Sequence, residues 1–191
     1  NLTDEIFMNS EVASLEPQAL WSQFANICSI PHPSKYEDAI LTYIKKLFSS
    51  KNLEHFQDEI GNVIVRKPAT AGLENLKMVT LQAHVDMVPQ KNLETEHDFT
   101  KDPIQPYIDG AWVKATGTTL GADNGIGLAA ILALMIADDV EHGPLEALLT
   151  VDEEAGMTGV NNLQPGTLKG ELLFNLDSED EGELTIGCAG G

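Results

Sequence analysis

Apolar positions along the chain form two kinds of pattern, and each predicts a different element. In the first third, apolar residues lie three or four positions apart, as on one face of a helix. They are Ile40, Leu41, Ile44, Leu47 and Phe48. Ser34 and Glu37 have the sequence of a capping box, which predicts that this helix begins at Ser34. Further helices are predicted over Gln18–Ser29, ahead of Pro31, and over Ala122–Ala137.

Short apolar runs predict strands between and after the helices. They are Leu53–Gln57, Asn62–Arg66, Met78–Ala83, Trp112–Ala115, Leu145–Val151, Leu172–Leu176 and Leu184–Ile186. We expect Gly61 to turn the chain between the first two, and the polar stretch Leu93–Ile108 to form a long surface loop. The runs over 145–151 and 172–176 are nearly continuous, as in strands buried on both faces. Helices that alternate with such strands indicate an α/β layered fold.

The composition narrows the class of protein. The chain has 191 residues, 42% of them apolar, which fits one globular domain and excludes disorder and collagen-like order. No stretch approaches the ~20 apolar residues of a membrane helix, and the start has no signal-peptide pattern. The net charge of −19 repels nucleic acid and anionic membranes and attracts cations. Cys28 and Cys188 are too few for a disulfide framework, so we expect a reducing cytoplasm.

Candidate chemistry lies at the predicted strand ends. The strand over 78–83 runs into His84 and Asp86, two positions that share one face. A carboxylate near a histidine often orients it as a metal ligand, although a polar strand end has the same sequence. Two more apolar strands end in acids, one in Glu153 and Glu154 and the other in Asp177. Ligands in open α/β sheets bind beyond the carboxyl ends of the strands, where these side chains are expected to meet.

The residue types at this edge indicate metal chemistry. One histidine with several carboxylates is typical of zinc or manganese sites, and a carboxylate can bridge two ions. A metal pair binds a substrate carbonyl and water together, and a carboxylate that is not a ligand can act as general base. The adjacent Glu153 and Glu154 could divide these two tasks. Asp123 lies at the start of a predicted helix, where an acid most often acts as a cap.

A different class of protein has one supporting motif. Gly125, Gly127 and Ala130 match the G-x-G-x-x-A fingerprint of dinucleotide-binding domains at the start of a helix. The polar stretch Thr116–Asn124 separates this motif from the preceding strand, and a nucleotide site explains neither the His-x-Asp pair nor the acidic strand ends. A dinucleotide-binding domain is therefore the weaker alternative.

Four segments together resemble one peptidase family. They are Ala83–Val88, Gly121–Gly127, Val151–Gly159 and Asn175–Glu179. In this order and spacing they are similar to the aminoacyl-histidine dipeptidases, a branch of the co-catalytic zinc peptidase superfamily. Gly117–Gly125, the turn Pro31–Ser34 and the end Thr185–Gly191 also resemble that branch. The resemblance covers essentially the whole chain.

The resemblance implies a role for each candidate residue. The implied ligands of two zinc ions, or of manganese or cobalt in their place, are His84, Asp123, Glu154 and Asp177. In this arrangement His84 and Asp177 share one ion, Glu154 binds the other, and Asp123 bridges both. Asp86 would orient His84, and Glu153 would be the general base that moves a proton from water to the leaving amine. A cis peptide bond between Asp123 and Asn124 is also implied.

The resemblance further implies a three-layer α/β/α catalytic domain with a mostly parallel central sheet. The implied reaction is hydrolysis of unblocked dipeptides, including Xaa-His; a tripeptidase or an N-acyl amino acid deacylase of the same superfamily is the alternative. Family members are longer, with an inserted lid domain and a further zinc-binding histidine. We therefore expect residues 1–186 to be the N-terminal part of an incomplete catalytic domain that is inactive alone. Residues 187–191 would begin the connection to a lid, and the whole protein would be a cytoplasmic homodimer that acts on small peptides.

Overall fold

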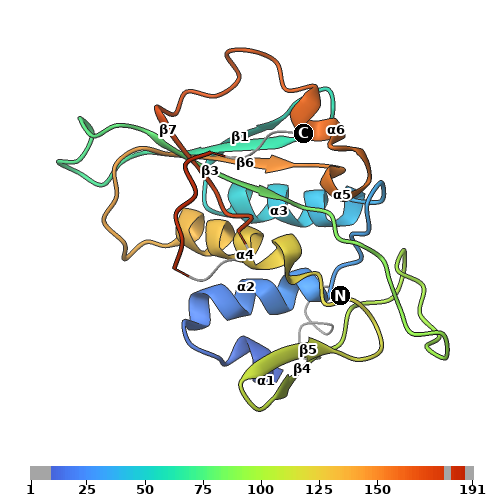
Figure 1. Ribbon diagram of the computed structural model, residues 1–191. Helices are drawn as coiled ribbons and strands as arrows, with labels where there is room; N and C mark the ends of the chain where they lie inside the picture. Colours follow the sequence, from blue (N-terminus) through green and yellow to red (C-terminus); the bar gives the residue numbers. More distant parts are fainter. Residues whose placement is uncertain (1–9, 179–181, 188–191) are drawn as a thin grey trace.

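Five of the seven predicted strands form one sheet in the computed structural model, which describes residues 10–178 and 182–187 (Figure 1). Its strands are β1 Glu54–Gln57, β2 Val63–Lys67, β3 Val79–His84, β6 Leu145–Thr150 and β7 Leu172–Asn175. They lie in the order β1–β2–β6–β3–β7. A separate two-stranded hairpin pairs β4 (Pro106–Asp109) with β5 (Trp112–Ala115).

The sheet is mixed. β6 is parallel to β3 and β3 to β7, whereas β2 is antiparallel to both β1 and β6. Four of its strands therefore share one direction, and β2 runs against them. The reversal comes from the turn before β2, where Gly61 has a φ of +120° and Asp58 accepts its N–H group. The predicted α/β class is confirmed, although only two of the four neighbouring pairs are parallel.

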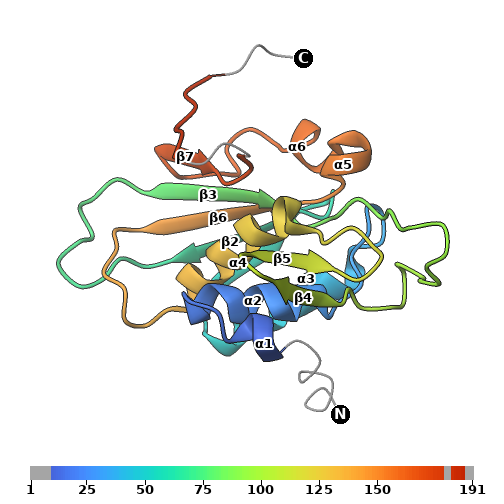
Figure 2. The same cartoon turned by 60° about the horizontal axis from the view of Figure 1, so that its bottom comes forward.

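Two helices, α3 (Asp38–Ser50) and α4 (Ala122–Ile136), pack against one face of the sheet (Figures 1 and 2). A third helix, α2 (Gln18–Cys28), packs against α4 on the side away from the sheet (Figure 1). The core between helices and sheet is apolar and includes Ile40, Ile44, Phe48, Val63, Val65, Leu128, Ile131, Leu132, Ala147 and Leu149. The short helices α5 (Glu153–Gly156) and α6 (Thr158–Asn161) lie on the opposite side (Figure 2). The carboxyl ends of β3 and β6 point toward the first turn of α4, which is where the candidate residues were expected.

Several predicted boundaries differ from the structure. The helix predicted from Ser34 begins at Asp38 and has no side-chain cap, because the Ser34 hydroxyl donates to Asp86 instead. Leu184–Ile186 is not a strand, and β4 occupies the end of the predicted loop over 93–108. The helices α1 (Ser10–Ala13), α5 and α6 were not predicted, since four residues are too few to show a helical period.

Strand β7 contradicts the prediction that it is buried on both faces. Leu172, Leu173 and Phe174 are 46%, 53% and 45% exposed. β7 forms the edge of the sheet within the described residues, with β3 as its neighbour. Continuous apolar sequence therefore does not distinguish an edge strand from a central one here.

The remaining predictions concern membrane helices, the two cysteines and the end of the chain. No helix among the described residues is long and apolar enough to cross a membrane. Cys28 is a buried free thiol, and Cys188 lies outside the described residues. Of the predicted connection over 187–191, only Gly187 is described.

Candidate metal centre

His84 is the centre of a cluster of carboxylates at the carboxyl end of the sheet. It is the last residue of β3 and is 1% exposed. Its Nε2 atom lies 3.1 Å from Asp123 Oδ1, 3.7 Å from Asp177 Oδ2 and 3.9 Å from Glu153 Oε2. These acids come from the start of α4, the segment after β7 and the start of α5. Three separate parts of the chain therefore converge on one imidazole nitrogen.

Glu154 joins the same cluster. One ligand atom each from His84, Asp123 and Glu154 lie within 4.8 Å of one another, a spacing at which one cation can contact all three. Imidazole nitrogen and carboxylate oxygen are donors that zinc accepts. The structure thus brings together all four residues for which the sequence suggested a metal role.

Asp86 lies behind His84 and connects it to the turn before α5. The Nδ1 atom of His84 is 2.9 Å from the backbone oxygen of Asp86 and 3.3 Å from Asp86 Oδ1. The same carboxylate accepts the N–H groups of Glu153 over 3.0 Å and of Glu154 over 3.2 Å. Ser34 Oγ donates to it over 2.7 Å. One carboxylate therefore sets the orientation of the histidine and the position of both glutamates.

The pKa values in the cluster show how strongly it favours positive charge. Burial alone lowers the pKa of His84, but Asp86, Asp177 and Asp123 outweigh burial and raise that pKa to about 9. Burial raises the pKa of Asp86, but the hydrogen bonds from His84, Ser34 and two backbone N–H groups lower it to about 2. Burial and neighbouring carboxylates raise the pKa of Glu153, Glu154 and Asp177. A bound cation would relieve the repulsion among these acids.

The first turn of α4 presents Asp123 to the cluster and does not use it as a cap. The N-cap is Gly121, without a side-chain hydrogen bond, and Asp123 itself has a non-helical backbone conformation. The Asp123–Asn124 peptide bond is cis, as the resemblance implied. Asn124 is 2% exposed and its Nδ2 donates to the backbone oxygen of Leu176 over 3.1 Å. Asn124 therefore ties the start of α4 to the segment that carries Asp177.

The glycines of the apparent nucleotide fingerprint have a packing role. A Cβ on Gly127 would overlap Asn124 Oδ1 and lie 2.6 Å from Leu176 O. A Cβ on Gly125 would lie 3.1 Å from Phe24 Cε2. Close approach of α4 to its neighbours accounts for both glycines without a nucleotide.

Two positions in the site were not identified as site residues from the sequence. The sequence predicts a helix cap at Ser34 and, through the resemblance, a cis peptide bond at Asn124. In the structure, the Ser34 hydroxyl donates to Asp86, and Asn124 Nδ2 donates to the backbone oxygen of Leu176, next to Asp177. Sequence spacing gives no signal for Ser34, which lies 52 residues from Asp86. The Pro31–Ser34 turn, noted in the resemblance, was the available indication.

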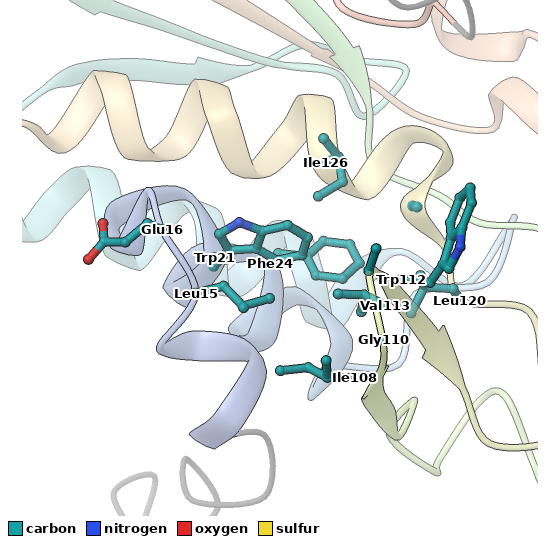
Figure 3. A pocket seen from close by; sticks show the side chains of 12 residues that line it. Leu15, Glu16, Trp21, Phe24, Ile108, Gly110, Trp112, Val113, Leu120 and Ile126 are labelled. Atoms are coloured by element: carbon teal, nitrogen blue, oxygen red, sulfur yellow. The ribbon is translucent and has the colours of Figure 1, made fainter.

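Cavities open near the cluster without enclosing it. One of about 250 Å³ lies beside Asp123 and Glu154. A larger one of about 460 Å³ lies among the α1–α2 connection, α2, the β4–β5 hairpin and the start of α4, and is mostly apolar. Trp21, Phe24 and Ile126 line its wall (Figure 3). Leu120 and Ala122 line both cavities, so the two are neighbours at the start of α4.

Comparison with known proteins gives a consistent result. The family model described as peptidase family M20/M25/M40 matches residues 80–187. The cytosol non-specific dipeptidase of Escherichia coli (strain K12) is 60% identical over 182 residues, which are 95% of this chain and 38% of that protein. The chain therefore spans little more than a third of the length of that relative.

Solved structures give the same result. The crystal structure of aminoacylhistidine dipeptidase from Vibrio alginolyticus matches with a TM-score of 0.91 and 58% identity, over 93% of this chain and 36% of that one. A tripeptidase from Staphylococcus aureus matches with a TM-score of 0.71 and 22% identity, over 87% of this chain and 44% of that one. The second likeness concerns the fold alone.

Proposed function

Because the chain belongs to peptidase family M20/M25/M40, we propose that the whole protein hydrolyses unblocked dipeptides, including Xaa-His dipeptides. The observation that carries this proposal is the convergence of His84, Asp123 and Glu154 within 4.8 Å. The names of the relatives from E. coli and V. alginolyticus support the substrate class. The activity is proposed for the whole protein, since this chain spans little more than a third of those relatives.

The donor set of the cluster fits a pair of zinc ions, with manganese or cobalt as possible substitutes. His84 and Asp177 would hold one ion, Glu154 the other, and Asp123 would bridge them. When bound, the ions would polarise the scissile carbonyl and lower the pKa of water. Asp86 keeps His84 in place through the contacts at its Nδ1 atom.

Glu153 is the proposed general base. Its carboxylate faces His84 Nε2 at 3.9 Å with its side chain 31% exposed, so it can reach both the cluster and a substrate. It accepts a proton from water as the water oxygen bonds to the peptide carbon. It then donates that proton to the leaving amine as the C–N bond breaks.

We also propose the surroundings in which the protein acts. A cytoplasmic location is supported by the named compartment of the E. coli relative. The substrate is a small peptide, and the net charge of −19 disfavours nucleic acid or an anionic membrane as a partner. A homodimer is proposed from the resemblance to the aminoacyl-histidine dipeptidases.

A substrate panel on the zinc-loaded whole protein tests the proposed reaction. The panel compares Xaa-His and other unblocked dipeptides with N-acetylated dipeptides, N-acyl amino acids and tripeptides. We expect turnover of the unblocked dipeptides only. Preference for N-acyl amino acids would indicate a deacylase, and preference for tripeptides a tripeptidase. Either preference would contradict the proposed substrate class while leaving the metal centre in place.

A further inference from the structure

Ser34 belongs to a segment that is held against the chain just beyond Asp86. The Ser34 N–H donates to Met87 O over 3.3 Å, and the Met87 N–H donates to His32 O over 3.2 Å. Pro33 and Met87 form a parallel bridge. Backbone hydrogen bonds on both sides of Pro33 therefore fix where the Ser34 side chain begins relative to the Asp86 carboxylate.

The Ser34 hydroxyl completes the set of donors around that carboxylate. It lies 2.7 Å from Asp86 Oδ2 and 3.4 Å from Met87 O, so the carboxylate is its nearer acceptor. Asp86 Oδ2 also accepts the Glu154 N–H, and Oδ1 accepts the Glu153 N–H. Asp86 is 1% exposed, so solvent has little access to replace a donor that is removed. Ser34 thus restrains the rotation of the one carboxylate that contacts both His84 and the Glu153–Glu154 turn.

The segment that carries Ser34, ahead of α3, makes a second contact near the cluster, through Glu37. Glu37, three residues after Ser34, is buried and its Oε1 accepts the Asp152 N–H over 3.0 Å. Asp152 has a φ of +52°, a conformation that is uncommon for residues other than glycine. Glu37 therefore holds Asp152 directly, and Ser34 acts on the next residue, Glu153, through the Asp86 carboxylate. The segment ahead of α3 acts as a frame for the cluster.

We propose that Ser34 is a positioning residue of the metal centre, acting through Asp86 on His84 and on Glu153. This role depends on the function proposed above, because Ser34 itself touches neither substrate nor metal. Loss of the hydroxyl would remove one of the three hydrogen-bond donors from Ser34, Glu153 and Glu154 that hold the Asp86 carboxylate, so that His84 binds metal less tightly and Glu153 is less well placed. Mutation of a residue that hydrogen-bonds directly to a metal ligand commonly lowers affinity or activity by ~10–100-fold. Ser34 is one contact further from the ligand His84, so we expect an effect at the lower end of this range.

The test compares Ser34→Ala and Ser34→Thr with the wild type in the whole protein. Zinc affinity is measured by competition with a chelating dye on metal-stripped protein, and kcat and KM are measured on a dipeptide. We expect Ser34→Ala to weaken zinc binding by ~10-fold and to lower kcat while KM changes little. Ser34→Thr, which keeps the hydroxyl, should restore both. The matched control is Ser50→Ala, whose exposed hydroxyl bonds only to Leu47 O at the end of α3.

Each outcome decides the role of Ser34. A lower melting temperature in Ser34→Ala with wild-type zinc affinity and kcat would show a merely structural residue and overturn the proposal. If Ser34→Ala does not fold, Ser34→Val has the shape of the Ser34→Thr side chain without its hydroxyl, and wild-type zinc affinity and kcat in Ser34→Val would overturn the proposal equally. A wild-type protein that neither binds zinc nor cleaves dipeptides would overturn the function and this role together.

Discussion

Acidic side chains lie at both ends of strand β6, and their surroundings differ. Near the start of the strand, Glu146 is completely buried. Arg66 Nε and Thr80 Oγ1 each donate to it over 2.9 Å, and the N–H groups of Lys169 and Gly170 also donate. Burial raises the pKa of Glu146, but these donors outweigh burial and lower it. This carboxylate has a charge partner and hydrogen bonds within the chain.

At the other end of β6, several carboxylates surround a single imidazole. Those of Asp123, Asp177 and Glu153 lie within 4 Å of His84 Nε2, and burial and mutual repulsion raise the pKa of Asp177 and Glu153. An acid that is paired within the chain stabilises the fold, whereas acids crowded around one histidine need positive charge from outside. The comparison separates a structural acid from a cluster that can hold a metal ion.

The largest effect is expected at the crowded cluster, on turnover. Glu153→Gln removes the proton acceptor but keeps the size of the side chain. It should lower kcat by ~10²–10⁴-fold in the whole protein, the contribution of a general base. Zinc content, measured by atomic emission, should stay at the wild-type value. Loss of zinc together with activity would mean that Glu153 is a ligand and that its role and that of Glu154 were assigned wrongly.

Substitution at the Arg66–Glu146 ion pair is expected to change the stability of the fold. Arg66→Met removes the cation and leaves Glu146 buried without its charge partner. Breaking a buried ion pair in this way costs ~3–5 kcal/mol, which denaturant unfolding would measure. Zinc affinity should not change. The matched control is Lys51→Met, whose pair with Asp138 is exposed, and little change is expected there. Equal losses in the free energy of unfolding for the two substitutions would show that the buried pair contributes no more to stability than the exposed pair.

A smaller effect is expected in the pH dependence of stability. The pKa of Glu146 is lower in the folded state than its ordinary value of 4.5. Its contribution is therefore present above that value and is lost as the pH falls through the folded pKa. Glu146→Gln should be less stable than the wild type at pH 7, and the difference should shrink in acid. Parallel unfolding curves of the two proteins from pH 7 to pH 3 would contradict this.

The sequence predicted much of the fold, because most long elements carry their own pattern. The stripe from Ile40 to Phe48 and the apolar run Leu145–Val151 became α3 and β6 nearly as expected. The exposure of β7 could not be predicted, since its apolar residues look the same whether or not another strand lies beside them. The antiparallel β2 depends on how the turn at Gly61 places the hairpin within the sheet, which residue patterns do not specify.

The candidate site was also predicted in large part. His84, Glu153, Glu154 and Asp177 follow strand ends, and the carboxyl ends of strands that run the same way meet at one edge. Their assignment as ligands or base rests on the resemblance and on geometry. Ser34 could not be recognised because its partner is distant in sequence, and a capping box uses the same residue types. The Ser34 hydroxyl makes the long-range hydrogen bond to Asp86, and α3 has no side-chain cap.

A calorimetric zinc titration of the metal-stripped protein, with His84→Ala alongside, tests most directly whether the crowded cluster is a metal centre. We expect tight zinc uptake by the wild type. Removal of this ligand should weaken uptake by more than the ~10–100-fold that loss of a supporting residue costs. Circular dichroism of both proteins would establish that His84→Ala is folded. Equal zinc uptake by the two proteins, or none by either, would contradict the assignment of His84 and its surrounding carboxylates as the metal site.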